Sequence, residues 1–197
     1  MSSLDIINAL NLSHAGVIRT ADALNAGLSR TTLMNLERSG VLDRVARGQY
    51  ILADVFIDEL FIMQQRYPGM TYSHETALFL HDMSERTPPC YSVTLPSNAR
   101  LSATFPADVK KYYIKPTLFM LGQTTLPSKM GHYITAYDTE RTICDILRSR
   151  NRVDSQTVST ALKQYTIRKH NDYKKLSEYA ETFGVTKLLR QYLEVLL

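Results

Sequence analysis

The sequence predicts an α+β protein: an amino-terminal winged helix-turn-helix followed by a mixed domain with a small sheet and a carboxy-terminal helical bundle. Three observations lead to this prediction. Two short helical patterns and a hairpin pattern follow one another within residues 19–52. Short strand-like segments, several of them stopped by proline, lie between residues 91 and 136, and helical periodicity continues from residue 138 onwards. A small sheet followed by helices is typical of the α+β class.

Residues 19–52 carry the pattern of two helices joined by a short turn. Thr20 is expected to cap a first helix that Gly27 ends. Ser29 is expected to cap a second helix that runs to Ser39, with a glycine directly after it. The gap of about three residues between the two helices is the length of the turn in a helix-turn-helix motif.

The second of these helices is expected to have one inward and one outward face. Thr32, Leu33 and Leu36 fall on the inward side at helical spacing. The outward side holds long or polar side chains without an acid, and Glu37 lies between the two faces. Asn and Arg can bind base edges, and Thr can bind phosphates. The outward residues are Thr31, Met34, Asn35 and Arg38, with Arg30 at their flank.

A hairpin is expected directly after this helix. Its strands are residues 42–45 and 49–52, residues 46–48 form the turn, and Arg44 and Arg47 place two positive charges near the tip. A helix-turn-helix followed by a two-stranded ribbon is a winged helix, whose wing usually lies along the DNA backbone. Helix spacing, caps and cation placement therefore favour DNA binding over the alternative, a helical hairpin that serves structure alone.

The remainder of the first domain is expected to consist of short flanking elements. A helix over residues 3–11 precedes the motif, and residues 17–18 can add a third strand. A densely apolar helix over residues 55–66 follows it and is expected to pack on both domains. A Tyr-Pro-Gly turn signal comes next, so the predicted domains are residues 1–66, which bind DNA, and residues 67–197.

The second domain is expected to open with a helix that Ser73 caps. Strands are then predicted at residues 91–95, 111–114, 117–121 and 131–136, with a loop at residues 124–127. Four helices are predicted at residues 138–148, about 154–168, 172–182 and 185–196. The first of these four begins with acidic residues, which suit the positive end of a helix dipole.

Positive charge is concentrated in the carboxy-terminal part. The whole chain has a formal net charge of +4, whereas residues 141–190 hold eleven Lys or Arg and five Asp or Glu, an excess of six positive charges. Such a run is either a solvated face or a surface that contacts a polyanion, DNA or RNA, because phosphate contacts carry no sequence information. The candidate contact residues are Arg148, Arg150, Arg152, Lys163, Arg168, Lys169, Lys174 and Lys175.

The residues give little support to an enzyme or a metal centre. His74, Glu75 and His81 lack the spacing of a zinc-binding helix, so no metal and no cofactor are predicted. The acidic residues near position 138 have arginines close by to pair with them. No serine stands in a nucleophile elbow, and eight scattered glycines form no phosphate-binding loop. No catalytic residue is therefore assigned.

The cysteines and the apolar segments indicate the compartment. Cys90 and Cys144 lie far apart without ligand spacing, which favours two reduced thiols over a disulfide. The amino-terminal residues lack a basic segment followed by a long apolar run, and no stretch approaches the length that spans a bilayer. We therefore expect a soluble, cytoplasmic protein without a membrane partner.

Three segments, taken in order, resemble the AbiEi family of antitoxins. Residues 27–50 (GLSRTTLMNLERSGVLDRVARGQY) resemble the winged-helix start of that family. Residues 73–81 (SHETALFLH), with the strand that ends VTLP at Pro96, resemble the start of its second domain. Residues 137–145 (YDTERTICD) resemble its Glu-Arg-Thr helix. Together these segments span nearly the full chain.

The resemblance implies an antitoxin of a type IV toxin–antitoxin pair that is linked to abortive phage infection. In that family the winged helix binds inverted repeats in the promoter of its own operon and represses it. The second domain opposes a nucleotidyltransferase-like toxin, usually without a stable complex. Inverted repeats imply two copies on the double-stranded DNA, while no coiled-coil seam demands a dimer in solution. Carried over by position, the DNA-binding residues are Ser29, Arg30, Thr31, Asn35, Arg38, Arg44 and Arg47.

This sequence departs from the family pattern in two places. His81-Asp82-Met83 stands where His-Gly is expected, and the segment after Val153 has no matching motif. No motif identifies residues that neutralise the toxin. Some relatives are thought to modify their toxin covalently, but no recognisable nucleotide site carries that activity to this chain. Two alternatives stay open: a transcription factor whose second domain senses a small molecule, and an enzyme that modifies the toxin.

Overall fold

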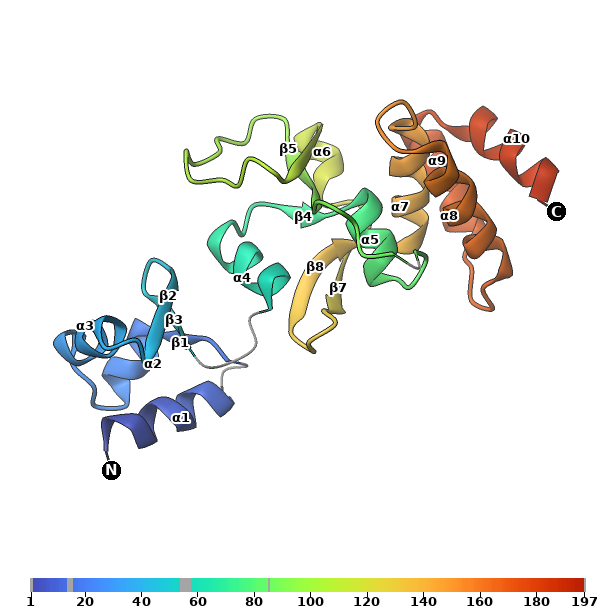
Figure 1. The fold of residues 1–197 in the computed structure, drawn as a ribbon. Coiled ribbons are helices and arrows are strands. Elements are labelled where there is room, and N and C mark those ends of the chain that lie inside the picture. The colour runs from blue at the N-terminus through green and yellow to red at the C-terminus, as the bar shows by residue number, and fades with distance from the viewer. Residues whose placement is uncertain (1, 14–15, 54–57, 85, 197) are drawn as a thin grey trace. The chain divides into compact units, whose positions relative to one another are not determined.

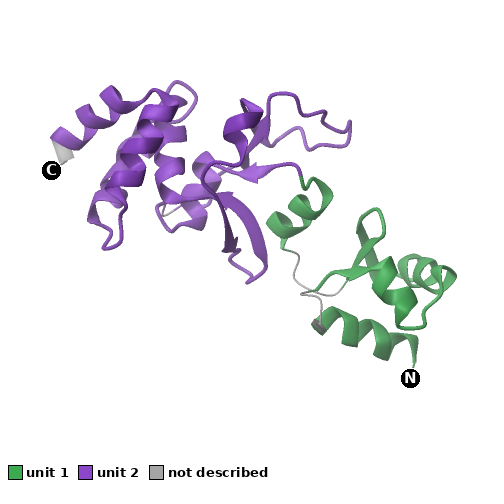
Figure 2. Cartoon of the chain, turned by 180° about the vertical axis from the view of Figure 1, so that it is seen from behind, with its two compact units in different colours: residues 1–68 green, residues 69–197 purple. Residues whose placement is uncertain are grey.

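The computed structural model describes residues 2–13, 16–53, 58–84 and 86–196, and the chain divides into two compact units (Figures 1 and 2). The first unit spans residues 1–68 and the second residues 69–197. Both contain helices and a small sheet, so the α+β prediction is confirmed. Within the described residues, no helix has the length and apolar character that crossing a membrane requires.

The first unit combines helices with a three-stranded antiparallel sheet. Its described helices are α1 (Ser3–Ser13), α2 (Thr20–Asn25), α3 (Arg30–Arg38) and α4 (Glu59–Arg66), and its strands are β1 (Ile18–Arg19), β2 (Leu42–Ala46) and β3 (Gln49–Leu52). The sheet order is β1-β3-β2. In the hairpin, Arg44 lies opposite Tyr50, and the register shifts between Arg44 and Ala46, just before the turn.

Ser29 and Thr20 illustrate two different outcomes for predicted helix caps. Ser29 caps α3 as predicted, because its Oγ accepts a hydrogen bond from the Thr32 amide at 3.0 Å. Thr20 is not the cap of α2: Arg19 holds that position, and Thr20 is the first helical residue. The Thr20 Oγ1 instead donates to the Gly48 carbonyl oxygen at 3.2 Å. A tertiary contact with the hairpin turn therefore replaces the predicted local cap.

Two buried clusters hold the first unit together. One joins helices α1 to α3 to the sheet through Ile7, Ile18, Ala23, Leu28, Leu33, Leu42 and Tyr50. The other lies between the sheet and α4, where Phe61 and Ile62 pack against Val45 and its buried neighbours. The side chain of Asp58 caps α4 by accepting from the Phe61 amide at 3.1 Å. The predicted start of this helix at Val55 lies outside the described residues.

The second unit is built on a five-stranded mixed sheet of order β6-β5-β4-β8-β7. The strands are β4 (Thr71–Tyr72), β5 (Ser92–Pro96), β6 (Lys110–Ile114), β7 (Gln123–Pro127) and β8 (Tyr133–Tyr137), and the short helices α5 (His74–Leu80) and α6 (Pro116–Phe119) follow β4 and β6. Strands β4 and β8 are parallel, as are β5 and β6, and the other pairs are antiparallel.

The secondary structure predicted for two segments of the second unit is wrong. Residues 117–121 were expected to form a strand, but Pro116 stands at the first position of helix α6. Proline suits that position because its fixed φ is helical and its missing N–H is not needed there. Residues 124–127 were expected to form a loop but belong to β7, which pairs with β8 from Gln123 to Pro127. Pairing with β8 decides the conformation of this segment, and a terminal proline is tolerated at a sheet edge.

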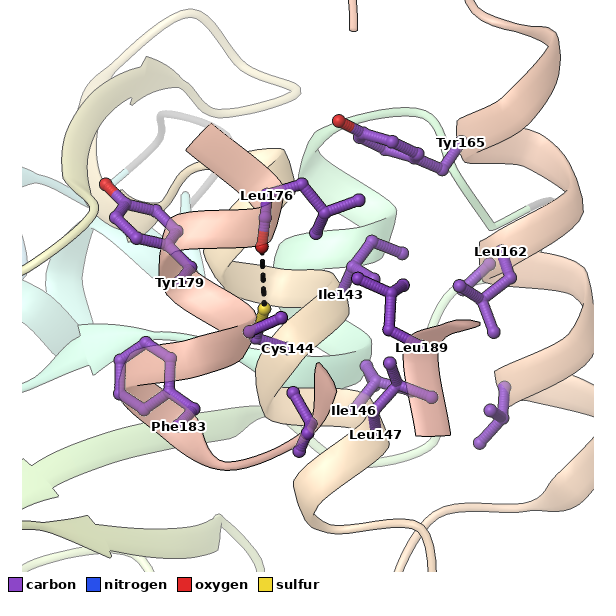
Figure 3. Close-up of a cluster of buried hydrophobic side chains, with 14 of the residues drawn as sticks. Ile143, Cys144, Ile146, Leu147, Leu162, Tyr165, Leu176, Tyr179, Phe183 and Leu189 are labelled. Carbon is purple, nitrogen blue, oxygen red and sulfur yellow. Dashed lines mark hydrogen bonds between the residues drawn. The ribbon is translucent and has the colours of Figure 1, made fainter. Parts of the chain in front are cut away.

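Four helices complete the second unit: α7 (Thr139–Arg148), α8 (Ser155–Ile167), α9 (Tyr173–Phe183) and α10 (Thr186–Leu196). The side chains of Asp138, Asp154 and Asp172 cap α7, α8 and α9 in turn. Figure 3 shows how the helices share one core, in which Ile143 and Leu147 of α7 lie among side chains of α8, α9 and α10. Helix α7 is buried on all sides, so its polar residues need internal partners.

Candidate nucleic-acid interface

The outward face of α3 is covered by exposed side chains. Leu33 is 1% exposed and Leu36 packs against the same core, so the opposite side of the helix is turned to solvent. Ser29 stands exposed at the amino-terminal end of this face, although its Oγ is also occupied by the cap. The exposed residues of α3 itself include Arg30, Thr31, Met34, Asn35 and Arg38.

A groove of about 560 Å³ runs between α3 and the β2–β3 hairpin. Its lining is basic, with three arginines and one acid, Glu37. Two contacts fix the hairpin turn against α2, because the Thr20 amide and its Oγ1 both donate to the Gly48 carbonyl oxygen, at 2.8 and 3.2 Å. The lining residues are Thr20, Arg30, Leu33, Met34, Glu37, Arg44, Arg47, Gly48 and Tyr50.

The arginines of this surface are not engaged with carboxylates. Arg30 and Arg38 on α3, and Arg44 and Arg47 on the hairpin, are all exposed. In the part of the first unit that the structure describes, none of the four forms an ion pair. Their positive charge is therefore available to an anionic partner, and groups of this kind attract phosphates.

The predicted basic residues of the second unit divide into two groups. Four of them contact other residues of the same unit. Two form ion pairs, Arg148 with Asp145 at 3.4 Å and Lys175 with Asp138 at 2.8 Å. Two donate to backbone carbonyl oxygens, Arg152 to that of Lys111 at 3.1 Å and Arg168 to that of His81 at 2.6 Å. The other four have no such contact among the described residues: Arg150, Lys163, Lys169 and Lys174. Arg152 and Arg168 are exposed as well, so contacts and not exposure separate the two groups. Charge counted along the sequence therefore overstates the charge free to meet a partner.

Arg141 pairs with a nearby acid, as predicted, and is also the centre of a buried polar network that was not predicted. Its side chain is 0% exposed and donates to Asp145 at 2.9 Å and to the carbonyl oxygens of Leu118 and Leu121 at 3.0 and 2.7 Å. The guanidinium also lies 4.1 Å from the ring centroids of Tyr137 and Phe183. The Glu-Arg-Thr segment thus joins α7 to α6 and to α9. The available signal was the spacing of four residues between Arg141 and Asp145, which places the two charges on one side of the helix.

The carboxylates near the start of α7 have partners that explain them structurally. Asp138 caps the helix and pairs with Lys175, and Glu140 accepts a hydrogen bond from the Tyr165 hydroxyl at 3.1 Å. Burial and the neighbouring carboxylate raise the pKa of Tyr165 far above its usual range, so this hydroxyl keeps its proton. Across the described residues, no three His, Cys, Asp or Glu side chains gather as metal ligands.

His74 forms a second buried polar group, at the junction of β4 and α5. Its φ is +48°, its ring nitrogens are hydrogen-bonded to Ser73 at 2.9 Å and to Ser149 at 3.0 Å, and its ring stacks on Tyr112 at 3.4 Å. Burial, and then the charge of Arg148, lowers the pKa of His74 well below its usual value. The imidazole is therefore neutral at pH 7 and serves as a packing and hydrogen-bonding group.

Ser73 occupies the N-cap position of α5 as predicted, but its side chain forms no capping hydrogen bond. Its hydroxyl accepts from the Thr94 Oγ1 at 2.8 Å and is bonded to the His74 ring. The predicted N-cap position is confirmed, and the capping hydrogen bond is absent because the buried His74 and the adjacent strand β5 occupy the same oxygen. The predicted core role of His74 agrees with its complete burial.

Comparison with known proteins finds a family model that is similar to part of the first unit. Residues 5–53, which contain most of α1, all of α2 and α3, and the hairpin, match the family model of the AbiEi antitoxin, described as a transcriptional regulator. The predicted resemblance to AbiEi antitoxins is confirmed over these residues, and the family indicates a transcriptional regulator of the antitoxin class. Such regulators are typically not enzymes.

One solved structure is similar in fold over nearly the full length of this chain. The crystal structure of the RV2827C protein from Mycobacterium tuberculosis aligns with 98% of this chain and 80% of that chain, with a TM-score of 0.55 and 14% sequence identity. At this identity the likeness concerns the fold alone. No curated protein sequence matches this chain.

Proposed function

We propose that this protein is a DNA-binding antitoxin that represses its own operon through a winged helix formed by α2, α3 and the β2–β3 hairpin. The observation that carries the proposal is the surface of α3 and its groove, where four exposed arginines have no carboxylate partner in the described part of the unit. This surface lies within the residues that match the regulator family. Both kinds of evidence support a polyanionic partner.

In this proposal α3 enters the major groove of the promoter, which has the width of an α-helix. Asn35 and Arg38 bind base edges, since their side chains can form paired hydrogen bonds with adenine and guanine. The groove of the protein between α3 and the hairpin is lined by Arg30, Arg44 and Arg47, which bind phosphates of the DNA backbone. Ser29 and Thr31 lie near the amino-terminal end of α3, where free backbone N–H groups favour an anion.

The second unit would oppose a nucleotidyltransferase-like toxin, without a stable complex between the two proteins. The antitoxin class of the family supports this part. Arg150, Lys163, Lys169 and Lys174 are exposed and stay candidates for a second polyanion surface. The proposal includes two copies of the protein on one inverted repeat, and a monomer in solution is compatible with it.

A titration of the DNA upstream of the gene at several salt concentrations tests the DNA-binding part. Arg38→Ala and Arg47→Ala should each weaken binding, and Arg47→Ala should also reduce the salt slope by about one, because one phosphate-binding cation is removed. Arg190→Ala is the matched control, because Arg190 is exposed in the second unit and belongs to no predicted contact set. If Arg38→Ala and Arg47→Ala bound the DNA as tightly as Arg190→Ala, the proposal that α3 and the hairpin contact DNA would be contradicted.

The same variants separate repression from toxin opposition. The full-length Arg38→Ala/Arg47→Ala protein should lose repression of a promoter reporter yet still rescue cells that express the toxin encoded by the adjacent gene. The reason is that the substitutions leave the second unit unchanged. Incubating the wild-type protein with that toxin and ATP, followed by intact mass measurement, tests the alternative, because an added phosphate on the toxin would support an enzyme.

A further inference from the structure

The exposed face of α3 contains one apolar side chain among polar ones. Met34 is 48% exposed, and it follows Arg30 and precedes Arg38 by four residues each, so it lies in the middle of the face. Met34 also lines the groove between the helix and the hairpin. Met34 belongs to neither of the two buried clusters that the described residues of the first unit form, so these clusters do not account for it.

We infer that Met34 recognises the C5 methyl group of a thymine in the major groove, an inference that rests on the proposed DNA-binding function. Base edges in the major groove present hydrogen-bond donors and acceptors and one apolar feature, the thymine methyl group. The neighbours of Met34 on α3 can bind the donors and acceptors. The flexible, polarisable thioether chain of Met34 suits the methyl group.

The position of Met34 distinguishes it from the other exposed apolar residues of the first unit. Leu4 and Leu12 belong to α1 and Leu24 to α2, whereas Met34 alone among the large exposed apolar residues of the described unit lies on α3. Thr31 also carries a methyl group on the same face, beside its hydroxyl. The experiment must therefore separate the contribution of Met34 from that of Thr31.

Deoxyuridine provides a probe that removes one methyl group from the DNA and changes nothing else on the base edge. Each thymine of the bound promoter fragment is replaced in turn by deoxyuridine, and the Kd is measured for the wild-type protein, Met34→Ala and Met34→Leu. At one position in each repeat, the wild-type affinity should fall roughly fourfold per methyl group that is no longer buried. Met34→Ala should bind both DNAs equally, and Met34→Leu should retain the difference.

Leu4→Ala is the matched control, because Leu4 has the same exposed fraction, 48%, on a helix outside the groove lining. It should behave like the wild-type protein. Wild-type binding that is insensitive to deoxyuridine at every position would overturn the inference while leaving the proposed function intact. Sensitivity that persists in Met34→Ala would also overturn it and would point to Thr31. Absence of wild-type binding to the promoter at low salt would overturn the proposed function and this inference together.

Discussion

The four arginines of the α3 surface and hairpin differ in their contacts from four arginines of the second unit. In the first unit Arg30, Arg38, Arg44 and Arg47 are exposed and have no carboxylate partner among the described residues. In the second unit Arg141 is fully buried and bonded to Asp145, and Arg148, Arg152 and Arg168 are bonded to groups of the same unit. Arginines of the first kind are available to a partner, and those of the second kind hold the fold.

This difference separates charge that matters for binding from charge that matters for stability. A buried ion pair cannot attract a distant polyanion effectively, because its field is cancelled by the partner at short range. An exposed, unpaired arginine contributes little to folding, because solvent satisfies it in both states. Substitutions in the two units should therefore have separable consequences, and the largest loss of stability is expected in the second unit.

The largest effect is expected for Arg141→Leu. The substitution leaves Asp145 buried without its closest partner and two carbonyl oxygens without a donor. Breaking a buried pair in this way should lower the free energy of unfolding of the second unit by about 3–5 kcal/mol. Hydrogen exchange followed by mass spectrometry measures the loss for each unit separately, and the first unit should retain its protection.

Two further variants determine whether the loss comes from the uncompensated charge. Arg141→Leu combined with Asp145→Leu should recover part of the stability, since neither buried charge is then left alone. Arg38→Leu should change the stability of the first unit by no more than about 0.5 kcal/mol. A large loss of stability from Arg38→Leu would contradict the division between the two kinds of arginine.

The second effect is a loss of stability of the second unit on acidification. The pKa of His74 lies well below its usual value of about 6.5 because the ring is buried, and burial also lowers the pKa of His81. Below about pH 6.5 the unfolded chain therefore binds protons that the folded unit does not. Folding stability therefore falls as the pH falls through the pKa of the unfolded chain, and His74 should account for part of this loss.

A single substitution and its control check the sign of this effect. His74→Gln should abolish a large part of the pH dependence of urea unfolding of the second unit, even if it lowers stability at pH 7. His170→Gln is the matched control, because His170 is exposed, and it should leave the pH dependence unchanged. Stability of the second unit that is constant from pH 7 to pH 5 in the wild-type protein would contradict a depressed pKa for His74.

The first unit was more predictable from sequence than the second, and the reason is the range of the contacts. The caps and the periodicity of α3 are local, so Ser29 and Leu33 indicate the helix and its buried face within ten residues. Helices α7 to α10 were predicted for the same reason. The α2 cap failed because Thr20 is bonded to Gly48, a contact over 28 residues that no local pattern contains.

In the second unit the missed features depend on partners that are distant in the sequence. Strand β7 exists because β8 pairs with it, and the two-residue strand β4, which was not predicted, lies between β5 and β8. The buried role of Arg141 depends on Leu118 and Phe183, more than twenty residues away on either side. Counting charges along residues 141–190 could not distinguish Arg141 or Arg148 from the exposed Arg150.

The smallest effect concerns Ser29, where a structural role and a predicted DNA contact coincide. Ser29→Ala removes the acceptor for the Thr32 amide and should lower the stability of the first unit by about 1 kcal/mol. Ser29→Asp restores the cap and suits the helix dipole, yet it places a negative charge at the predicted phosphate contact. Ser29→Asp should therefore have near wild-type hydrogen-exchange protection but weaker promoter binding than Ser29→Ala. If Ser29→Asp bound the promoter as tightly as the wild-type protein, Ser29 would be a cap and nothing more, and the DNA-contacting surface of α3 would begin at Arg30.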